Sequence, residues 1–162
     1  MKNILPLILL TSLIFFSCSK TKSGDILTFP SDWLVQHDYM GCLIMGLSPL
    51  ENEYDQFREN GNAVMEKLPG SMTYDEYTNA NLETMKRVMT NFVVIETSDD
   101  EVNGIECKKI VYTHTMGQLD IKVLSYFLVD GKEGYVLTFS ASPEQYEKYL
   151  PEFKRIAGSI NL

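Results

Sequence analysis

The residues of this chain that could do chemistry are two histidines, three cysteines and two clusters of carboxylates. His37, His114, Cys42 and Cys107 are zinc-ligand types, but no C-x-x-C or H-x-x-x-H pair gives them the usual local spacing. A hydrolase would need one histidine beside an activated serine or cysteine, and the sequence contains no G-x-S-x-G motif. The pattern therefore favours two polar strand histidines, and it predicts neither a catalytic site nor a metal site.

The two acidic clusters match metal-binding patterns only in part. The segment "DDEVNG" (99–104) resembles the start of a calcium-binding loop, but Ile110 stands where that loop requires a bidentate glutamate. The segment "ENEYD" (51–55) could hold a divalent cation only weakly. We interpret both as solvated, as a turn and a loop respectively, and no cofactor is predicted.

Cys18 is the one residue to which the sequence assigns a specific modification. Lys2 supplies a positive start, residues 4–16 form an apolar run too short to span a membrane, and small Ser17 precedes the cysteine. This order resembles a bacterial lipoprotein signal, although Phe15 replaces the usual leucine three residues before the cysteine. We therefore predict a signal peptide over 1–17 and a lipidated Cys18, followed by a polar tether to residue 24.

The residues after Cys18 favour one membrane over the other. Ser19 replaces the aspartate that retains many lipoproteins at the inner membrane, and the basic tether lacks the acidic tract of surface-export signals. The expected location is the bacterial cell envelope, with a lipid anchor in the outer membrane and the domain facing the periplasm.

Length and charge limit the remaining possibilities. Residues 25–162 suffice for one domain with a sizeable core. A formal net charge of −8 argues against nucleic-acid binding, which needs an excess of lysine and arginine. An oxidising compartment would permit a disulfide between Cys42 and Cys107, but their apolar flanks favour two buried thiols.

Strands outnumber helices in the predicted secondary structure. "DILTFPSDWLVQ" (25–36) predicts two short strands around a turn, and further strands are expected within 40–50, 61–70, 92–115 and 118–141. Asn103-Gly104 and Asp130-Gly131 mark tight turns in the last two of these segments. Such short connections predict a mostly antiparallel sheet.

Two helices are expected to cover this sheet. The first follows a capping box formed by Thr73 and Glu76, and it places Leu82, Met85, Val88 and Met89 on one face. The second is predicted to start at Pro143 with Ser142 as its N-cap, and to kink at Pro151. Its apolar stripe consists of Tyr146, Tyr149, Leu150, Phe153, Ile156 and Ala157. The fold class is thus α+β, with a central, mostly antiparallel sheet between helices (an α/β/α sandwich).

The order of these pieces resembles the PsbP-like domains. The similarity runs through "FPSDW", "LSPL", "GNAVMEKLPGSMTYDEY", "VNGIECKKIVYT" and "GYVLTFSASPEQYEKYLPEFKRIAGSI", across residues 25–162. Its most specific part is the pattern F-x-x-I-x-x-S-I from Phe153 to Ile160. The resemblance implies the same α/β/α fold and a noncatalytic role, because members of this family mostly act as binding, assembly or stabilising modules.

The expected function is therefore a membrane-anchored periplasmic lipoprotein with a noncatalytic binding or assembly module. Its partner would be an envelope protein or a small ligand, and its only membrane attachment would be the lipid on Cys18. Two alternatives stay open at this point: an envelope enzyme of hydrolase type that uses carboxylates and His114, and a purely structural stabiliser of an envelope complex.

Overall fold

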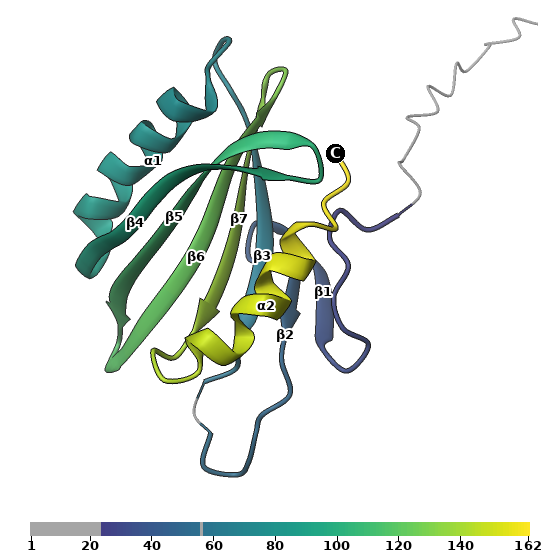
Figure 1. The fold of residues 1–162 in the computed structure, drawn as a ribbon, viewed down its shortest axis with the longest axis vertical. Coiled ribbons are helices and arrows are strands. Elements are labelled where there is room, and N and C mark those ends of the chain that lie inside the picture. Colours follow the sequence, from purple (N-terminus) through teal and green to yellow (C-terminus); the bar gives the residue numbers. More distant parts are fainter. Residues whose placement is uncertain (1–23, 56) are drawn as a thin grey trace, which may run out of the picture.

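The computed structural model describes residues 24–55 and 57–162. Over these residues the chain forms a seven-stranded antiparallel sheet with one helix packed on each face (Figure 1). The α+β class, the antiparallel sheet and the α/β/α layering predicted from the sequence are confirmed. The predicted signal peptide, and Cys18 with it, lies outside the described residues.

The sheet has a strand order that differs from the chain order. Its strands lie side by side as β1-β2-β3-β7-β6-β5-β4, so that β4 and β1 are its two edges. The strands are β1 (Leu34–Tyr39), β2 (Cys42–Leu47), β3 (Asn60–Lys67), β4 (Thr90–Val102), β5 (Ile105–Met116), β6 (Leu119–Asp130) and β7 (Glu133–Ala141). The helices are α1 (Tyr74–Val88), between β3 and β4, and α2 (Tyr146–Ala157), after β7.

Helix α1 begins with the capping box that the sequence predicts. Thr73 Oγ1 accepts from the Glu76 backbone N–H at 3.1 Å, and Glu76 Oε2 accepts from the Thr73 N–H at 2.9 Å. These bonds satisfy two backbone donors that a helix leaves unpaired at its start. The expected apolar face is correct for Leu82, Met85 and Met89 but wrong for Val88, which is 70% exposed because the helix ends there at the rim of the sheet.

Helix α2 starts three residues later than predicted. Residues 143–145 form a turn, and Gln145 is the N-cap without a side-chain capping bond. Its side-chain amide instead donates to Glu51 at 3.1 Å, a tertiary contact that competes with local capping. The helix continues through Pro151, which is exposed. Its predicted apolar stripe is confirmed, with Phe153 fully buried.

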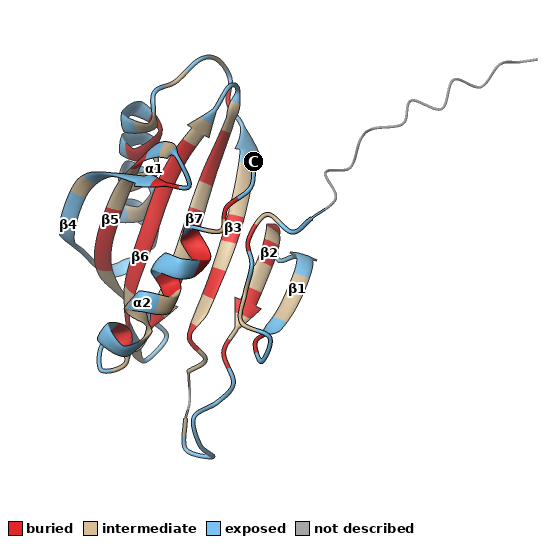
Figure 2. Ribbon diagram, turned by 45° about the vertical axis from the view of Figure 1, so that its right-hand side comes forward, coloured by how far each residue is buried: buried red, intermediate tan, exposed pale blue. Residues whose placement is uncertain are grey.

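The segment before β1 is not the strand that its sequence suggests. Residues 25–33 cross the same sheet face as α2, and β1 is the only strand of the two predicted there. Phe29 lies over Gly46 of β2, where an added Cβ atom would lie 2.2 Å from its ring. It also lies beside Gly61 of β3, where a Cβ atom would lie 3.3 Å from the Phe29 ring and 2.6 Å from that of Phe139. Trp33 then stacks on Phe29 with ring centroids 5.8 Å apart. This segment and α2 together cover the larger core of the molecule (Figure 2).

Candidate functional site

The zinc-type residues occupy different parts of the sheet. His37 lies on β1, with Nε2 3.7 Å from Asp25 Oδ1, whereas His114 lies on β5 beside the ring of Tyr112. Cys42 and Cys107 are buried free thiols on β2 and β5, with three strands between them. Nowhere in 24–55 or 57–162 do three or more histidine, cysteine or acidic side chains gather as a metal site would require.

The two acidic segments that partly match metal-binding loops make structural contacts. The segment 99–104 forms the end of β4 and the turn into β5, as predicted, with Asn103 and Gly104 both at positive φ. Asn103 donates from Nδ2 to the Ile160 carbonyl at 2.7 Å, which ties this turn to the C-terminal residues. In the other segment, Glu51 accepts hydrogen bonds from Gln145 and Lys148, and so holds the loop after β2 against α2.

The most exposed element of the sheet is its outermost strand, β4. Its outer edge pairs with no other strand in the described part of the chain, and nearly all its 13 residues are exposed (Figure 2). Val93, Val94 and Ile95 form a consecutive aliphatic run that is 57%, 38% and 55% exposed, respectively. A long edge strand that carries aliphatic side chains is a template on which another strand can pair.

Two further apolar residues lie near the same end of the sheet. Val88 closes α1 two residues before β4 begins, and Met116 closes β5 next to the Thr90–Thr115 pair that starts the β4–β5 ladder. They are 70% and 53% exposed, respectively. We call the group of Val88, Val93, Val94, Ile95 and Met116 the outer-strand surface.

The other half of β4 is acidic and regular. From Thr97 to Val102 it pairs with β5 without interruption, whereas register shifts interrupt the pairing between Thr90 and Glu96. Asp99, Asp100 and Glu101 are exposed along the regular half. Charges and bulges both discourage unspecific pairing of an edge strand with other strands.

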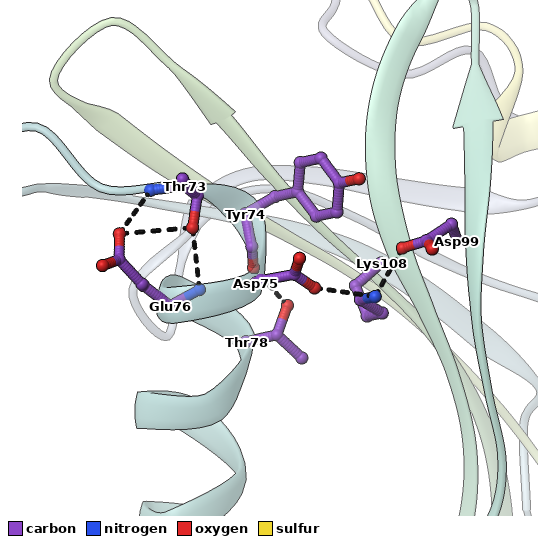
Figure 3. A network of polar contacts seen from close by, with 7 residues as sticks. All are labelled: Thr73, Tyr74, Asp75, Glu76, Thr78, Asp99 and Lys108. Carbon is purple, nitrogen blue, oxygen red and sulfur yellow. Dashed lines mark hydrogen bonds and ion pairs between the residues drawn. The ribbon is translucent and has the colours of Figure 1, made fainter.

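A network of polar contacts fixes β4 to the start of α1 (Figure 3). Lys108 on β5 forms ion pairs with Asp75 of α1, at 2.7 Å, and with Asp99 of β4. Its ammonium also lies 5.6 Å from the centre of the Tyr74 ring. The hydrogen bonds that Lys108 donates to the two carboxylates raise its pKa, and the charge of Asp99 raises the pKa of Tyr74. The charged lysine thus links α1 to β4 through Asp75 and Asp99, whose carboxylates would otherwise repel each other.

The sequence predicts this strand but not its exposure. An unbroken apolar run such as 92–95 is typical of a buried strand as much as of an edge. The order of strands in a sheet is a tertiary property, and β4 is an edge because β3 pairs with β7 and not with β4, the next strand along the chain. The signal that could have identified an edge is the acidic run 99–101 within the same strand.

Solved structures of other proteins have a similar fold. A protein of unknown function from Pseudomonas aeruginosa aligns with a TM-score of 0.64 at 12% identity, covering 82% of this chain and 85% of that chain. The PsbP of the cyanobacterium Synechocystis sp. PCC 6803 aligns with a TM-score of 0.61 at 14% identity, over 83% and 84% of the two chains. LpqN of Mycobacterium tuberculosis, which is involved in cell envelope biogenesis, gives 0.61 at 13% identity, over 81% and 78%.

No protein-family model matches the chain, and no curated protein matches it in sequence. The likeness to cyanobacterial PsbP nevertheless confirms the PsbP-like fold that the sequence predicts. At 12 to 14% identity it concerns the fold alone, so function has to be argued from the surface of this chain. Separately, no helix of the described segments has the length and apolar character needed to cross a bilayer.

Proposed function

We propose that this protein is a lipid-anchored module of a bacterial envelope that binds a partner protein through the edge of β4. The observation that carries the proposal is the aliphatic run Val93–Ile95, exposed on a strand whose outer edge pairs with no strand of residues 24–55 and 57–162. Single exposed apolar residues are ordinary on a protein surface, but a consecutive run on a free edge favours strand addition. The proposed role is noncatalytic, in line with the scattered titratable residues.

Main-chain and side-chain contacts would come from different halves of the strand. The regular segment Thr97–Val102 offers free backbone N–H and C=O groups, which give affinity in strand addition. The bulged segment before it offers the aliphatic side chains. Because Asp99, Asp100 and Glu101 lie on the regular half, the matching partner strand carries lysine or arginine there and apolar residues beyond it.

The orientation of β4 relative to the anchor supports this arrangement. Gly24, the first described residue, lies near the C-terminal residues, because Asn161 N–H donates to the Ile26 carbonyl. Asn103, at the acidic end of β4, contacts Ile160 of the same region. Ile95 is eight residues earlier, or about 26 Å away along an extended strand. The aliphatic run therefore lies at the end of the domain farther from the tether.

Lipidation of Cys18 would keep the domain close to the membrane. A fully extended tether over residues 19–24 spans about 20 Å. Two or more acyl chains give stable anchoring, whereas one holds a protein only marginally.

We infer an outer-membrane anchor facing the periplasm, because Ser19 and the basic tether lack inner-membrane retention and surface-export features. Replacing Cys18 with Ala should move the protein out of the membrane fraction or block its processing, and mass spectrometry of the N-terminus checks this directly.

Site-specific photo-crosslinking in intact cells tests the binding surface. A photoreactive residue at position 95 should give a discrete cross-linked species, whereas the same residue at Leu34, an exposed position on the opposite edge strand, should not. A second change, Val93→Glu, should abolish the product while leaving the fold intact, because Val93 is 57% exposed. Equal cross-linking from both edges, or a product insensitive to Val93→Glu, would contradict the proposal.

A further inference from the structure

A groove lies on the opposite side of the sheet from α1. It is a cavity of about 220 Å³ between α2 and strands β4, β5 and β6. Val111 and Leu124, adjacent on β5 and β6, are buried at its floor together with Tyr146 of α2. Ile95 and Leu150 form its apolar sides. The centre of this groove therefore suits an apolar group.

The polar residues of the groove are mostly basic. Lys109, Lys122 and Lys154 line it, with only two carboxylates, Glu96 and Glu147. Lys109 pairs with Glu96 at 2.8 Å, and Lys122 pairs with Glu147 at 2.9 Å. The groove thus keeps one excess positive charge in a chain whose net charge is −8. Because the surrounding surface repels anions, this local excess marks the groove as the place where a small anion can be held.

The positive charges are unequally distributed along the groove. On β5, Val111 lies between Lys109 and Thr113, and Thr113 is the cross-strand partner of Lys122. The two lysines therefore lie at opposite ends of the apolar floor. Lys154 belongs to the Lys109 end, because it lies seven residues, or about 10 Å along α2, beyond Glu147, which pairs with Lys122. In agreement, the hydrogen bond from Lys109 and, to a smaller extent, the charge of Lys154 lower the pKa of Glu96. That end has two lysines for one carboxylate, whereas at the other end Lys122 and Glu147 balance each other.

The two lysines at the ends of the floor are already partly desolvated. The side chains of Lys109 and Lys122 are 19% and 23% exposed, and the Lys122 ammonium lies 4.1 Å from the centre of the Tyr146 ring. A partly desolvated ammonium interacts more strongly with an added anion than a fully hydrated one does. The ordering of these long side chains is also complete before a ligand arrives, which lowers the entropic cost of binding.

We propose that this groove binds a small amphiphilic monocarboxylate, with its carboxylate between Lys109 and Lys154 and its apolar body over Val111 and Leu124. The volume corresponds to about seven water molecules, which limits the apolar body to the size of a medium-length acyl chain or a single aromatic ring. One excess charge matches a monoanion, and the carboxylate of Glu96 disfavours a dianion such as phosphate.

NMR titration of the uniformly ¹⁵N-labelled domain with octanoate tests the proposal. Amide shifts should concentrate on Val111, Leu124 and Leu150, with saturation at millimolar concentrations. Acetate lacks the apolar body and octylamine reverses the charge, so each should bind at least about tenfold more weakly. Shifts that spread over the whole surface, or octylamine binding as tight as that of octanoate, would overturn the inference.

A matched pair of variants separates local charge from net charge. Lys154→Gln should weaken octanoate binding about fivefold or more. Lys86→Gln removes the same charge from an exposed position on α1, so it should change the affinity by less than about twofold. Equal effects of the two variants would show a response to net charge alone and would overturn the site. The groove and the outer-strand surface share Ile95, but neither Lys154 nor Lys86 belongs to that surface. A failure of octanoate binding in the isolated domain is therefore distinguishable from a failure of the proposed partner binding.

Discussion

Lys108 on β5 and Asp75 in the first turn of α1 form an ion pair 2.7 Å long, which joins the helix to the sheet beside the edge strand (Figure 3). The lysine side chain is only 15% exposed, whereas Asp75 and Asp99 are 56% and 70% exposed. The lysine is thus the shielded member of a network whose acids reach solvent. Removal of the Lys108 side chain would leave the carboxylates of Asp75 and Asp99 without the positive charge that they share.

Replacing Lys108 with Met should destabilise the protein by about 1 kcal/mol, the upper range for partly exposed ion pairs. Lys86→Met, which removes an exposed pair with Glu83 on α1, should cost less than about 0.5 kcal/mol. Urea denaturation at pH 7 measures both. A smaller loss for Lys108 than for Lys86 would show that the network contributes little to stability.

The pH dependence of stability provides a second test with the same Lys108→Met variant. The two carboxylates raise the folded-state pKa of Lys108 above its unfolded value of about 10.4. The folded protein therefore keeps a proton that the unfolded chain loses as pH rises. The stability difference between wild type and Lys108→Met should be constant between about pH 7 and pH 10 and should shrink above pH 10. A difference that is unchanged up to the limit of reversible unfolding would contradict this assignment.

Phe153 anchors α2 to the sheet and should be the most costly truncation in that helix. It is fully buried and stacks on Phe139 of β7, with ring centroids 5.5 Å apart. Phe153→Ala should lower the free energy of unfolding by about 3–5 kcal/mol. Tyr54→Ala removes an aromatic ring that is 82% exposed, and it should cost less than about 0.5 kcal/mol. A loss below about 1 kcal/mol at Phe153 would exclude this packing role.

The fold illustrates which features local sequence determines. The capping box of Thr73 and Glu76, the turn at Asn103-Gly104 and the stripe of α2 all depend on residues within a few positions of one another, and sequence predicted each of them. The strand predicted within residues 25–33 is wrong, because the Phe29 ring of this segment packs against glycines on two distant strands. The groove beneath α2 was missed for the same reason, since its three lysines are assembled from β5, β6 and the helix.

Gly46 is therefore expected to be intolerant of even a methyl group. A Cβ atom there would lie 2.2 Å from the Phe29 ring, so the ring or the strand would have to move. Gly46→Ala should destabilise the protein by about 1–3 kcal/mol. Gly70→Ala is the control, because a Cβ atom at Gly70 meets no neighbour within 4 Å. Equal thermal midpoints for the two variants would show that Phe29 does not occupy this position in solution.

The two described cysteines should differ in reactivity from an ordinary thiol. Burial raises the pKa of both, for Cys107 to about 12, so neither is a thiolate at neutral pH. Iodoacetamide should leave both unmodified in the native protein and should modify both in urea. Cys42, which is 8% exposed, should react before the fully buried Cys107 as urea is raised. Mass spectrometry that finds the two joined by a disulfide would contradict the free thiols.

Glu59 is a buried carboxyl group whose titration should make the free energy of unfolding depend on pH. It is 2% exposed, and Ser48 Oγ donates to its Oε2 at 3.4 Å. Burial, followed by the negative charges of Asp55 and Glu51, raises its folded-state pKa above the unfolded value of about 4.3. The folded protein then binds more protons than the unfolded chain between the two pKa values, so this group lowers stability as pH rises through that window.

Glu59→Gln should remove this contribution, because its amide carries no charge at any pH. The free energy of unfolding of the variant minus that of wild type should therefore rise between pH 4 and pH 7. Glu53→Gln removes an exposed carboxyl of the same loop and is the control for the loss of one negative charge. Urea denaturation at four pH values is sufficient for both comparisons. A difference for Glu59→Gln that falls with pH would mean that the folded state stabilises the carboxylate, and that its contact with Ser48 outweighs burial.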